Sequence, residues 1–81
     1  MKMQRILAAY EKTGSELIWE FELNCPVHIL RPIIDIDCDD SELLQIHKIC
    51  SKQFDALAKL MPELQPLFTE DQDIFYECFL L

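Results

Sequence analysis

The sequence predicts an α+β fold: a three-stranded antiparallel sheet, covered on one face by one long helix and a shorter helical segment. The N-terminal hairpin would supply two strands and the C-terminal segment the third. Three observations predict this fold. Apolar and polar residues alternate over residues 16–23, a second strand-like run covers residues 73–80, and residues 39–61 repeat with the helical period. At 81 residues the chain makes one domain, residues 1–81, with a thin core.

The hairpin is predicted from two runs, residues 4–11 and 16–23, on either side of a turn that contains the only glycine, Gly14. A glycine here suits a four-residue loop that needs a positive φ. The second run predicts a half-buried strand, with its apolar face formed by Leu17, Trp19, Phe21 and Leu23 and its polar face by Glu16, Glu20 and Glu22. In the first run either set could face the core: Ile6, Ala8 and Tyr10, or Leu7 and Ala9.

The long helix is predicted over residues 39–61. Asp39 is a suitable N-cap, Glu42 completes a capping box, and Pro62 ends the helix. The apolar stripe consists of Leu43, Ile46, Cys50, Phe54, Leu57 and Met61. We expect the mostly buried residues to include Trp19, Phe21, Leu43, Ile46, Cys50, Phe54 and Leu57.

The remaining segments are less regular. Residues 27–31 follow Pro26 and could form one helical turn or an extended segment, and an irregular arm follows. Residues 63–72 are expected to be a loop with one helical turn, held to the core by Leu64, Leu67 and Phe68. Residues 73–80 carry apolar side chains on both faces, which indicates either a central strand or one that faces a partner.

The formal net charge is −8, from fifteen acidic and seven basic residues. Phosphate binding requires a basic face, so this charge argues against nucleic acid and against an acidic membrane surface as partners. It suits a basic protein partner, whose approach it would accelerate, or it only keeps the protein soluble.

The four cysteines, Cys25, Cys38, Cys50 and Cys78, form no CxxC motif. The N-terminus lacks an apolar run of signal-peptide length, and no segment has the length of a membrane span. We therefore expect a cytoplasmic protein with reduced thiols, no disulfide and no bound zinc.

Two acidic groups are candidate partner-binding residues. The first contains Asp35, Asp37, Asp39, Asp40 and Glu42, and the second contains Glu70, Asp71, Asp73 and Glu77. The first begins with the spacing of a calcium loop, but its glycine position is Asp40 and its closing position is Ile46, so calcium binding is not expected. Each group is either a solvated loop or a contact surface for a basic partner.

No residue pattern indicates an active site. The serines lack the flanking glycines of a nucleophile elbow, and His28 and His47 have no cysteine pair beside them for zinc. With one glycine, the chain has no phosphate-binding loop. We expect a protein that is not an enzyme and binds no cofactor.

The hairpin RILAAYEKTGSELIWEFEL, followed by a helix-containing middle and the strand DIFYECF, resembles small bacterial immunity proteins of polymorphic toxin systems. The stretch MPELQPLF at residues 61–68 is similar to the tail of cloacin-type immunity proteins, which inhibit a ribonuclease. The matching pieces cover about half of the chain, and residues 27–40 depart from both patterns. The resemblance implies a protein that neutralises a basic toxin domain, favouring a ribonuclease, by stoichiometric binding.

A rival interpretation is a small adaptor or homodimeric structural module that pairs through an exposed strand. An inhibitor should show clustered carboxylates with one or two apolar anchors, whereas a dimerising module should show a long apolar strip. A third interpretation, a metal- or thiol-based sensor, requires cysteines that converge in space.

Overall fold

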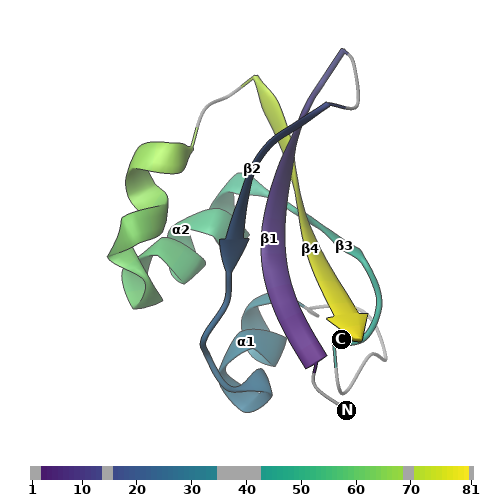
Figure 1. The fold of residues 1–81 in the computed structure, drawn as a ribbon. Helices are drawn as coiled ribbons and strands as arrows, with labels where there is room; N and C mark the ends of the chain where they lie inside the picture. The colour runs from purple at the N-terminus through teal and green to yellow at the C-terminus, as the bar shows by residue number, and fades with distance from the viewer. Residues whose placement is uncertain (1–2, 14–15, 35–42, 69–70, 81) are drawn as a thin grey trace.

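The computed structural model describes residues 3–13, 16–34, 43–68 and 71–80 (Figure 1). Within these residues a four-stranded antiparallel sheet has the order β2-β1-β4-β3. Its strands are β1 (Met3–Glu11), β2 (Leu17–Glu22), β3 (His47–Ile49) and β4 (Gln72–Leu80). The helices α1 (Val27–Ile34) and α2 (Ser51–Leu60) and the 3-10 helix η1 (Pro62–Leu67) lie on one side of the sheet (Figure 1). The predicted α+β class is confirmed, but the expectation of three strands is wrong.

The N-terminal hairpin forms as predicted, with one irregularity. The backbone N–H of Glu11 donates to the carbonyl of Glu16 (3.0 Å) and closes the loop. Ala9 pairs with Trp19 but Tyr10 pairs with Leu17, so the additional residue Ile18 forms a β-bulge. The bulge turns Leu17 to the face opposite Trp19, and Leu17 is 47% exposed. The prediction that Leu17 shares the apolar face of Trp19 is therefore wrong.

β4 is a central strand, which is one of the two alternatives that its apolar faces indicated. It pairs with β1 along nine positions, from Met3–Leu80 to Glu11–Gln72, and with β3 on its other side. Its N–H and C=O groups beside β3 are therefore partly satisfied by a short edge strand.

The prediction of one helix over residues 39–61 is wrong. Leu43 has a left-handed backbone (φ 52°), His47–Ile49 form β3, and α2 begins only at Ser51. The apolar residues at 43, 46, 50, 54, 57 and 61 fit a helical period, but the free edge of β4 gives the segment before Ser51 a pairing partner that a helix would leave unused. Tertiary pairing thus overrides the local period.

Gln53 caps α2 from inside its first turn. The backbone N–H of Cys50 donates to Gln53 Oε1 (2.8 Å), which is the reciprocal half of a capping box. Gln53 Nε2 donates to the carbonyls of Ile33 and Ile34 at the end of α1, both at 3.1 Å. One side chain therefore links the two helices. The predicted cap Asp39 and its partner Glu42 lie outside the described residues.

α1 begins after Pro26, whose carbonyl accepts from the N–H of Leu30 (3.2 Å), so the helical alternative for this segment is confirmed. The helix contains Pro32 and extends to Ile34, further than the single turn expected. Leu30 and Ile34 are its buried residues.

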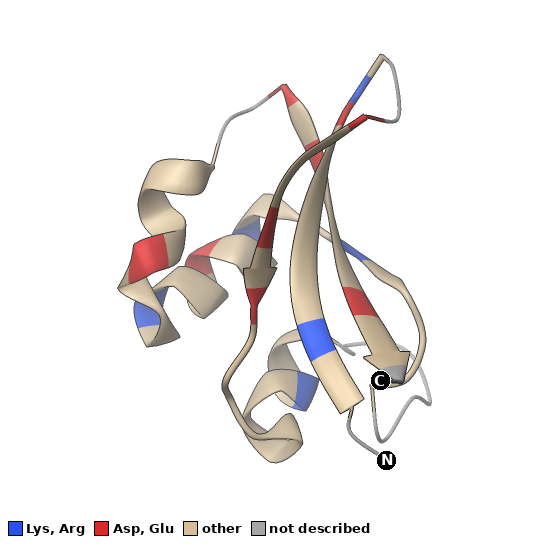
Figure 2. Ribbon diagram, viewed as in Figure 1, with Lys and Arg blue, Asp and Glu red and all other residues tan. Residues whose placement is uncertain are grey.

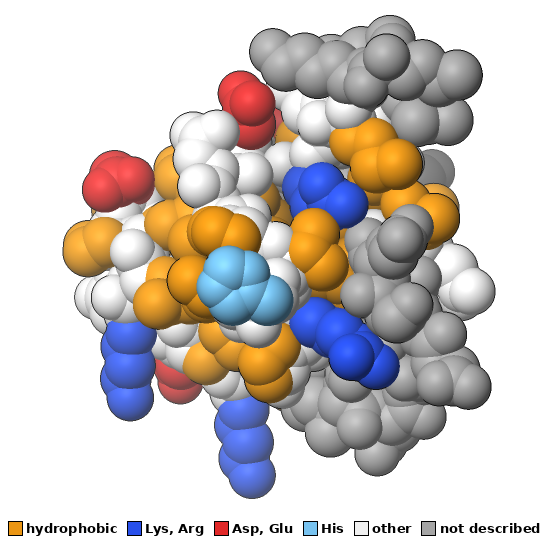
Figure 3. All heavy atoms as spheres, turned by 90° about the horizontal axis from the view of Figure 1, so that it is seen from below, with side chains coloured by type: hydrophobic (Ala, Val, Ile, Leu, Met, Phe, Trp, Pro, Cys, Tyr) orange, Lys and Arg blue, Asp and Glu red, His pale blue; other side chains and the backbone are white. Residues whose placement is uncertain are grey.

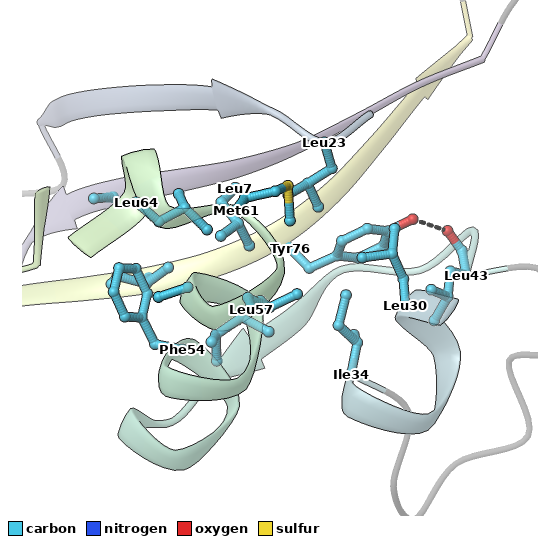
Figure 4. Packing of buried hydrophobic residues seen from close by; sticks show 14 residues of the cluster. Leu7, Leu23, Leu30, Ile34, Leu43, Phe54, Leu57, Met61, Leu64 and Tyr76 are labelled. Atoms are coloured by element: carbon cyan, nitrogen blue, oxygen red, sulfur yellow. Dashed lines mark hydrogen bonds between the residues drawn. The ribbon is translucent and has the colours of Figure 1, made fainter. Parts of the chain in front are cut away.

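The core fills the space between the helices and one face of the sheet (Figure 4). Leu7 and Tyr76 come from the two central strands, and Phe54, Leu57 and Leu64 come from α2 and η1. Burial of Leu43, Phe54 and Leu57 is confirmed, as is the contact of Leu64 and Leu67 with the core. Phe68 is exposed on one side, although its ring lies 5.0 Å from that of Phe54.

Tyr76 joins this core to the backbone. Its ring is fully buried, and its hydroxyl donates to the carbonyl of Leu43 (2.6 Å), as the dashed line in Figure 4 marks. Left-handed backbone costs a residue with a Cβ about 1–2 kcal/mol. The hydrogen bond and the complete burial of the Leu43 side chain offset this cost.

Four of the expected core positions differ. Ile46 is 67% exposed, because it precedes β3 and is not part of a helix that would bury it, and Cys50 is exposed at the N-cap of α2. Trp19 and Phe21 are only half-buried, since β2 is an edge strand. Trp19 Nε1 donates to Gln72 Oε1 (3.1 Å), across β1.

None of the described helices is both long and apolar enough to cross a membrane. Cys25, Cys50 and Cys78 are free thiols, and Cys38 lies outside the described residues.

Candidate functional site: the open face of the sheet

Along each strand of the sheet, every second side chain points away from α1, α2 and η1. We call this surface the open face. The strand register shows which residues belong to the open face. Each of them lies opposite another open-face residue on a neighbouring strand, and along the strands they alternate with residues of the core face. The open face consists of Gln4, Ile6, Ala8, Tyr10, Leu17, Glu20, Glu22, Lys48, Asp73, Phe75, Glu77 and Phe79.

The centre of the open face is closely packed, although no described helix covers it. Ala8 is 0% exposed and Ile6 is 4% exposed. The rings of Tyr10 and Phe75 pack edge to face, with their centroids 5.9 Å apart. The hydroxyl of Tyr10 donates to Glu77 Oε2 (2.7 Å). These side chains form a small second cluster, on the opposite side of β1 from the main core.

The register explains how Tyr10 reaches Glu77. Tyr10 lies opposite Asp73, whereas Glu77 lies opposite Ile6, four residues and about 13 Å further along the strands. Both side chains must therefore extend toward each other along the sheet, above the small residue Ala8. This arrangement accounts for the complete burial of Ala8.

The surroundings of Tyr10 are electronegative. The hydrogen bond to Glu77 raises the pKa of Tyr10 above its ordinary value, and desolvation and the negative charges of Glu77 and Glu20 raise it further. The neutral hydroxyl is thus maintained as a donor that holds one oxygen of Glu77.

Acidic residues occur on β2 and on β4, the two strands that flank β1 (Figure 2). Glu22 and Glu77 lie opposite Ile6 from its two neighbouring strands, and Glu20 lies opposite Ala8. Because neighbouring strands are about 4.8 Å apart, the backbones that carry these two acidic groups are separated by about 10 Å. Glu20 and Glu22 are exposed, so the face presents two acidic borders and an apolar centre.

Lys48 is the cation among the described residues of the open face. Its Nζ lies 3.6 Å from Asp73 Oδ1, and its side chain is exposed, so this ion pair contributes little to stability. It does occupy Asp73, one of the predicted partner-binding residues. Glu20 and Glu22 form no contact of this kind with Lys48, which is on the opposite edge strand.

The other predicted contact residues divide into two groups. Asp35, Asp37, Asp39, Asp40, Glu42 and Glu70 lie outside the described residues. Asp71 is exposed beside the start of β4, two residues before Asp73. Asp71 and Asp73 line an open hollow of about 550 Å³. Lys12 and Lys48 also line it, so acidic and basic side chains are mixed there.

The end of the molecule at α1 has a different character (Figure 3). Hydrophobic side chains surround a histidine there, and basic side chains lie among them. α1 exposes His28, Ile29 and Arg31. Within the described part of the chain, the acidic surface is therefore concentrated on the sheet and not on α1.

We find no group of three or more His, Cys, Asp or Glu side chains among the described residues that could hold a metal ion. Cys50 lies beside an apolar hollow of about 270 Å³ between α1 and α2, with Ile33 and Ala56.

The predicted acidic groups contained Glu77 but not its partner Tyr10, and they did not include Glu20 or Glu22. The alternation of residues 16–23 already put Glu20 and Glu22 on one face, and the apolar residues on both faces of 73–80 pointed to a second contact surface. The missing information was the strand order. Only the placement of β1 between β2 and β4 brings these residues onto one surface.

The chain was also compared with known proteins. No curated protein and no solved structure matches it. A family model described as a domain of unknown function (DUF7683) matches residues 4–77, which include every element of the fold except the ends of β1 and β4. The chain therefore belongs to the DUF7683 family.

Proposed function

We propose that this protein acts by stoichiometric binding, and that its open face binds a basic protein domain. The observation that carries the proposal is an apolar centre between two carboxylate borders on a sheet face that no described helix covers. Burial of Leu17 and Phe79, which are 47% and 44% exposed, would supply apolar anchors. Glu20 and Glu22 would pair with cations of the partner and accelerate its approach.

The specific role that we propose is immunity: neutralisation of a toxin nuclease domain, with a ribonuclease favoured. The support is the resemblance of the hairpin and of residues 61–68 to immunity proteins, together with the net charge of −8. A nuclease holds a polyanion with cationic side chains, and a rigid carboxylate surface can compete for them. Carboxylates on β2 and β4 lose less conformational entropy on binding than those on a flexible tail.

The alternative is a homodimeric or adaptor module. Its support is also on the open face, in the exposed side chains of Leu17 and Phe79. A symmetric pairing through this face would, however, bring the carboxylates of Glu20 and Glu22 toward those of a second copy. Like charges across an interface oppose association, so the charges favour a basic partner over a second copy.

A titration can test the proposal, with the C-terminal domain of the protein encoded upstream of this gene as the probe; we expect that domain to be basic. The double variant Glu20→Gln/Glu22→Gln removes two charges from the open face. Its control, Asp55→Asn/Glu63→Gln, removes the same charge from exposed positions on α2 and η1. We expect a 1:1 complex, weakened about tenfold or more by the first variant and less than about twofold by the second.

Equal weakening by both double variants would mean that only net charge matters and would contradict a defined interface. A neighbouring gene without a basic domain, or a basic domain that does not bind, would contradict the immunity role. Sedimentation of the free protein tests the alternative, because a dimer that dissociates on Phe79→Glu substitution would favour the structural module.

A further inference from the structure

We propose that the Tyr10–Glu77 pair anchors an arginine side chain of the partner, so that the open face selects arginine over lysine. This inference rests on the proposed function, since it specifies the chemistry of the basic partner. It is based on how the Glu77 carboxylate is arranged beside the rings of Tyr10 and Phe75. A negative net charge alone does not require this arrangement.

The first step is the fixed position of Glu77. A surface glutamate normally samples several rotamers, and ordering it on binding costs conformational entropy. Here the Tyr10 hydroxyl, 2.7 Å from Oε2, already orders the carboxylate. Each carboxylate oxygen has two acceptor positions, so Oε1 and the second position of Oε2 remain available to a planar fork of N–H donors.

The second step is the aromatic support beside this carboxylate. Tyr10 and Phe75 are half-buried and meet edge to face, so part of each ring surface reaches solvent next to Glu77. A guanidinium is planar and weakly hydrated and stacks on aromatic faces, whereas an ammonium is compact and strongly hydrated. A lysine would gain the charge of Glu77 but little from the rings.

The third step is the second carboxylate. Glu20 lies opposite the buried Ala8, on the β2 side of the Tyr10–Glu77 hydrogen bond. A guanidinium bound to the Glu77 carboxylate above Ala8 therefore has a second anionic group on its other side. A point-like ammonium cannot span two such groups at once, but the five N–H donors of an arginine point in several directions.

The test is a calorimetric titration of the full-length protein with two peptides, hexa-arginine and hexa-lysine, each acetylated at its N-terminus and amidated at its C-terminus. We expect hexa-arginine to bind about fivefold or more tightly than hexa-lysine, in line with bidentate pairing and stacking. Glu77→Gln should abolish this preference while it preserves an acceptor for Tyr10. Glu63→Gln, which changes the net charge equally on η1, should preserve the preference.

Equal affinities of the two peptides for the wild type would overturn the inference, as would a preference that persists in Glu77→Gln. Circular dichroism of each variant shows whether it is folded, and Tyr10→Phe provides a second variant that loosens Glu77 without changing the charge. The peptides do not require the toxin domain. Equal peptide binding would therefore leave the proposed function standing, whereas a basic domain that fails to bind would leave the arginine preference standing.

Discussion

The two faces of the sheet carry similar residues in different surroundings. β4 alternates Tyr76 on the covered face with Phe75 and Glu77 on the open face. On the covered face the tyrosine hydroxyl bonds to a backbone carbonyl, whereas on the open face that of Tyr10 bonds to a carboxylate. Aromatic residues therefore occur on both faces, and the hydrogen-bond partner of the tyrosine hydroxyl distinguishes the open face from the covered one.

The largest expected effect compares two phenylalanines. Phe54 is buried under the sheet, and Phe54→Ala should destabilise the protein by about 3–5 kcal/mol through lost transfer free energy and a cavity. Phe79 is 44% exposed on the open face, and Phe79→Ala should cost less than about 1 kcal/mol. Urea denaturation of both variants measures the difference. Similar losses at the two positions would show that the open face contributes as much to stability as the core.

The second prediction compares the two tyrosines. Tyr76→Phe leaves the carbonyl of Leu43 without its buried donor and should cost about 1–3 kcal/mol. Tyr10→Phe should cost under about 1 kcal/mol, because water can replace the hydroxyl at Glu77. Thermal unfolding of the two variants at neutral pH checks the order. If Tyr10→Phe is the more destabilised variant, the open-face cluster is structural.

The third prediction concerns the helices that cover one face of the sheet. Gln53→Ala removes the hydrogen bonds that join the end of α1 to the start of α2 and should cost about 1–2 kcal/mol, as the loss of a helix cap does. Gln65→Ala, at an exposed position of η1, should change stability by less than about 0.5 kcal/mol. Denaturant midpoints measured side by side would decide. Equal midpoints would mean that water replaces the Gln53 contacts.

The sequence was sufficient to predict three of the four strands and part of the core. Residues 16–23 alternate between apolar and polar side chains and residues 73–80 are apolar on both faces, and the boundaries of both runs agree closely with β2 and β4. Phe54 and Leu57 are buried as the helical period predicted. These are local signals, and the structure preserves them because no tertiary partner competes for the same residues.

The segment before Ser51 shows where local signals are insufficient. A helical period and a short edge strand both fit residues 43–50, and only the free edge of β4 selects the strand. The actual cap has cysteine where serine or threonine is usual, so it carries little signal in sequence. The candidate site depends even more on topology, since the alignment of Glu22, Ile6 and Glu77 requires the strand order.

The smallest expected effect is a pH dependence that belongs to the open face alone. The pKa of Tyr10 is raised in the folded protein, chiefly by its hydrogen bond to Glu77, whereas in the unfolded chain it is near 10. Above about pH 10 the unfolded state therefore loses this proton more readily than the folded state. The stabilisation by Tyr10 is fully present below about pH 10 and is lost as the pH rises through the raised pKa.

Wild type and Tyr10→Phe share every other titrating group, including Tyr76, so the difference between their free energies of unfolding isolates Tyr10. We expect this difference to be constant from about pH 7 to 9 and to shrink above about pH 10. Urea titrations of both proteins across this range measure it. A difference that stays constant to about pH 11 would mean that Tyr10 and Glu77 are not hydrogen-bonded in solution, and the ordered carboxylate on which the arginine preference depends would be lost with it.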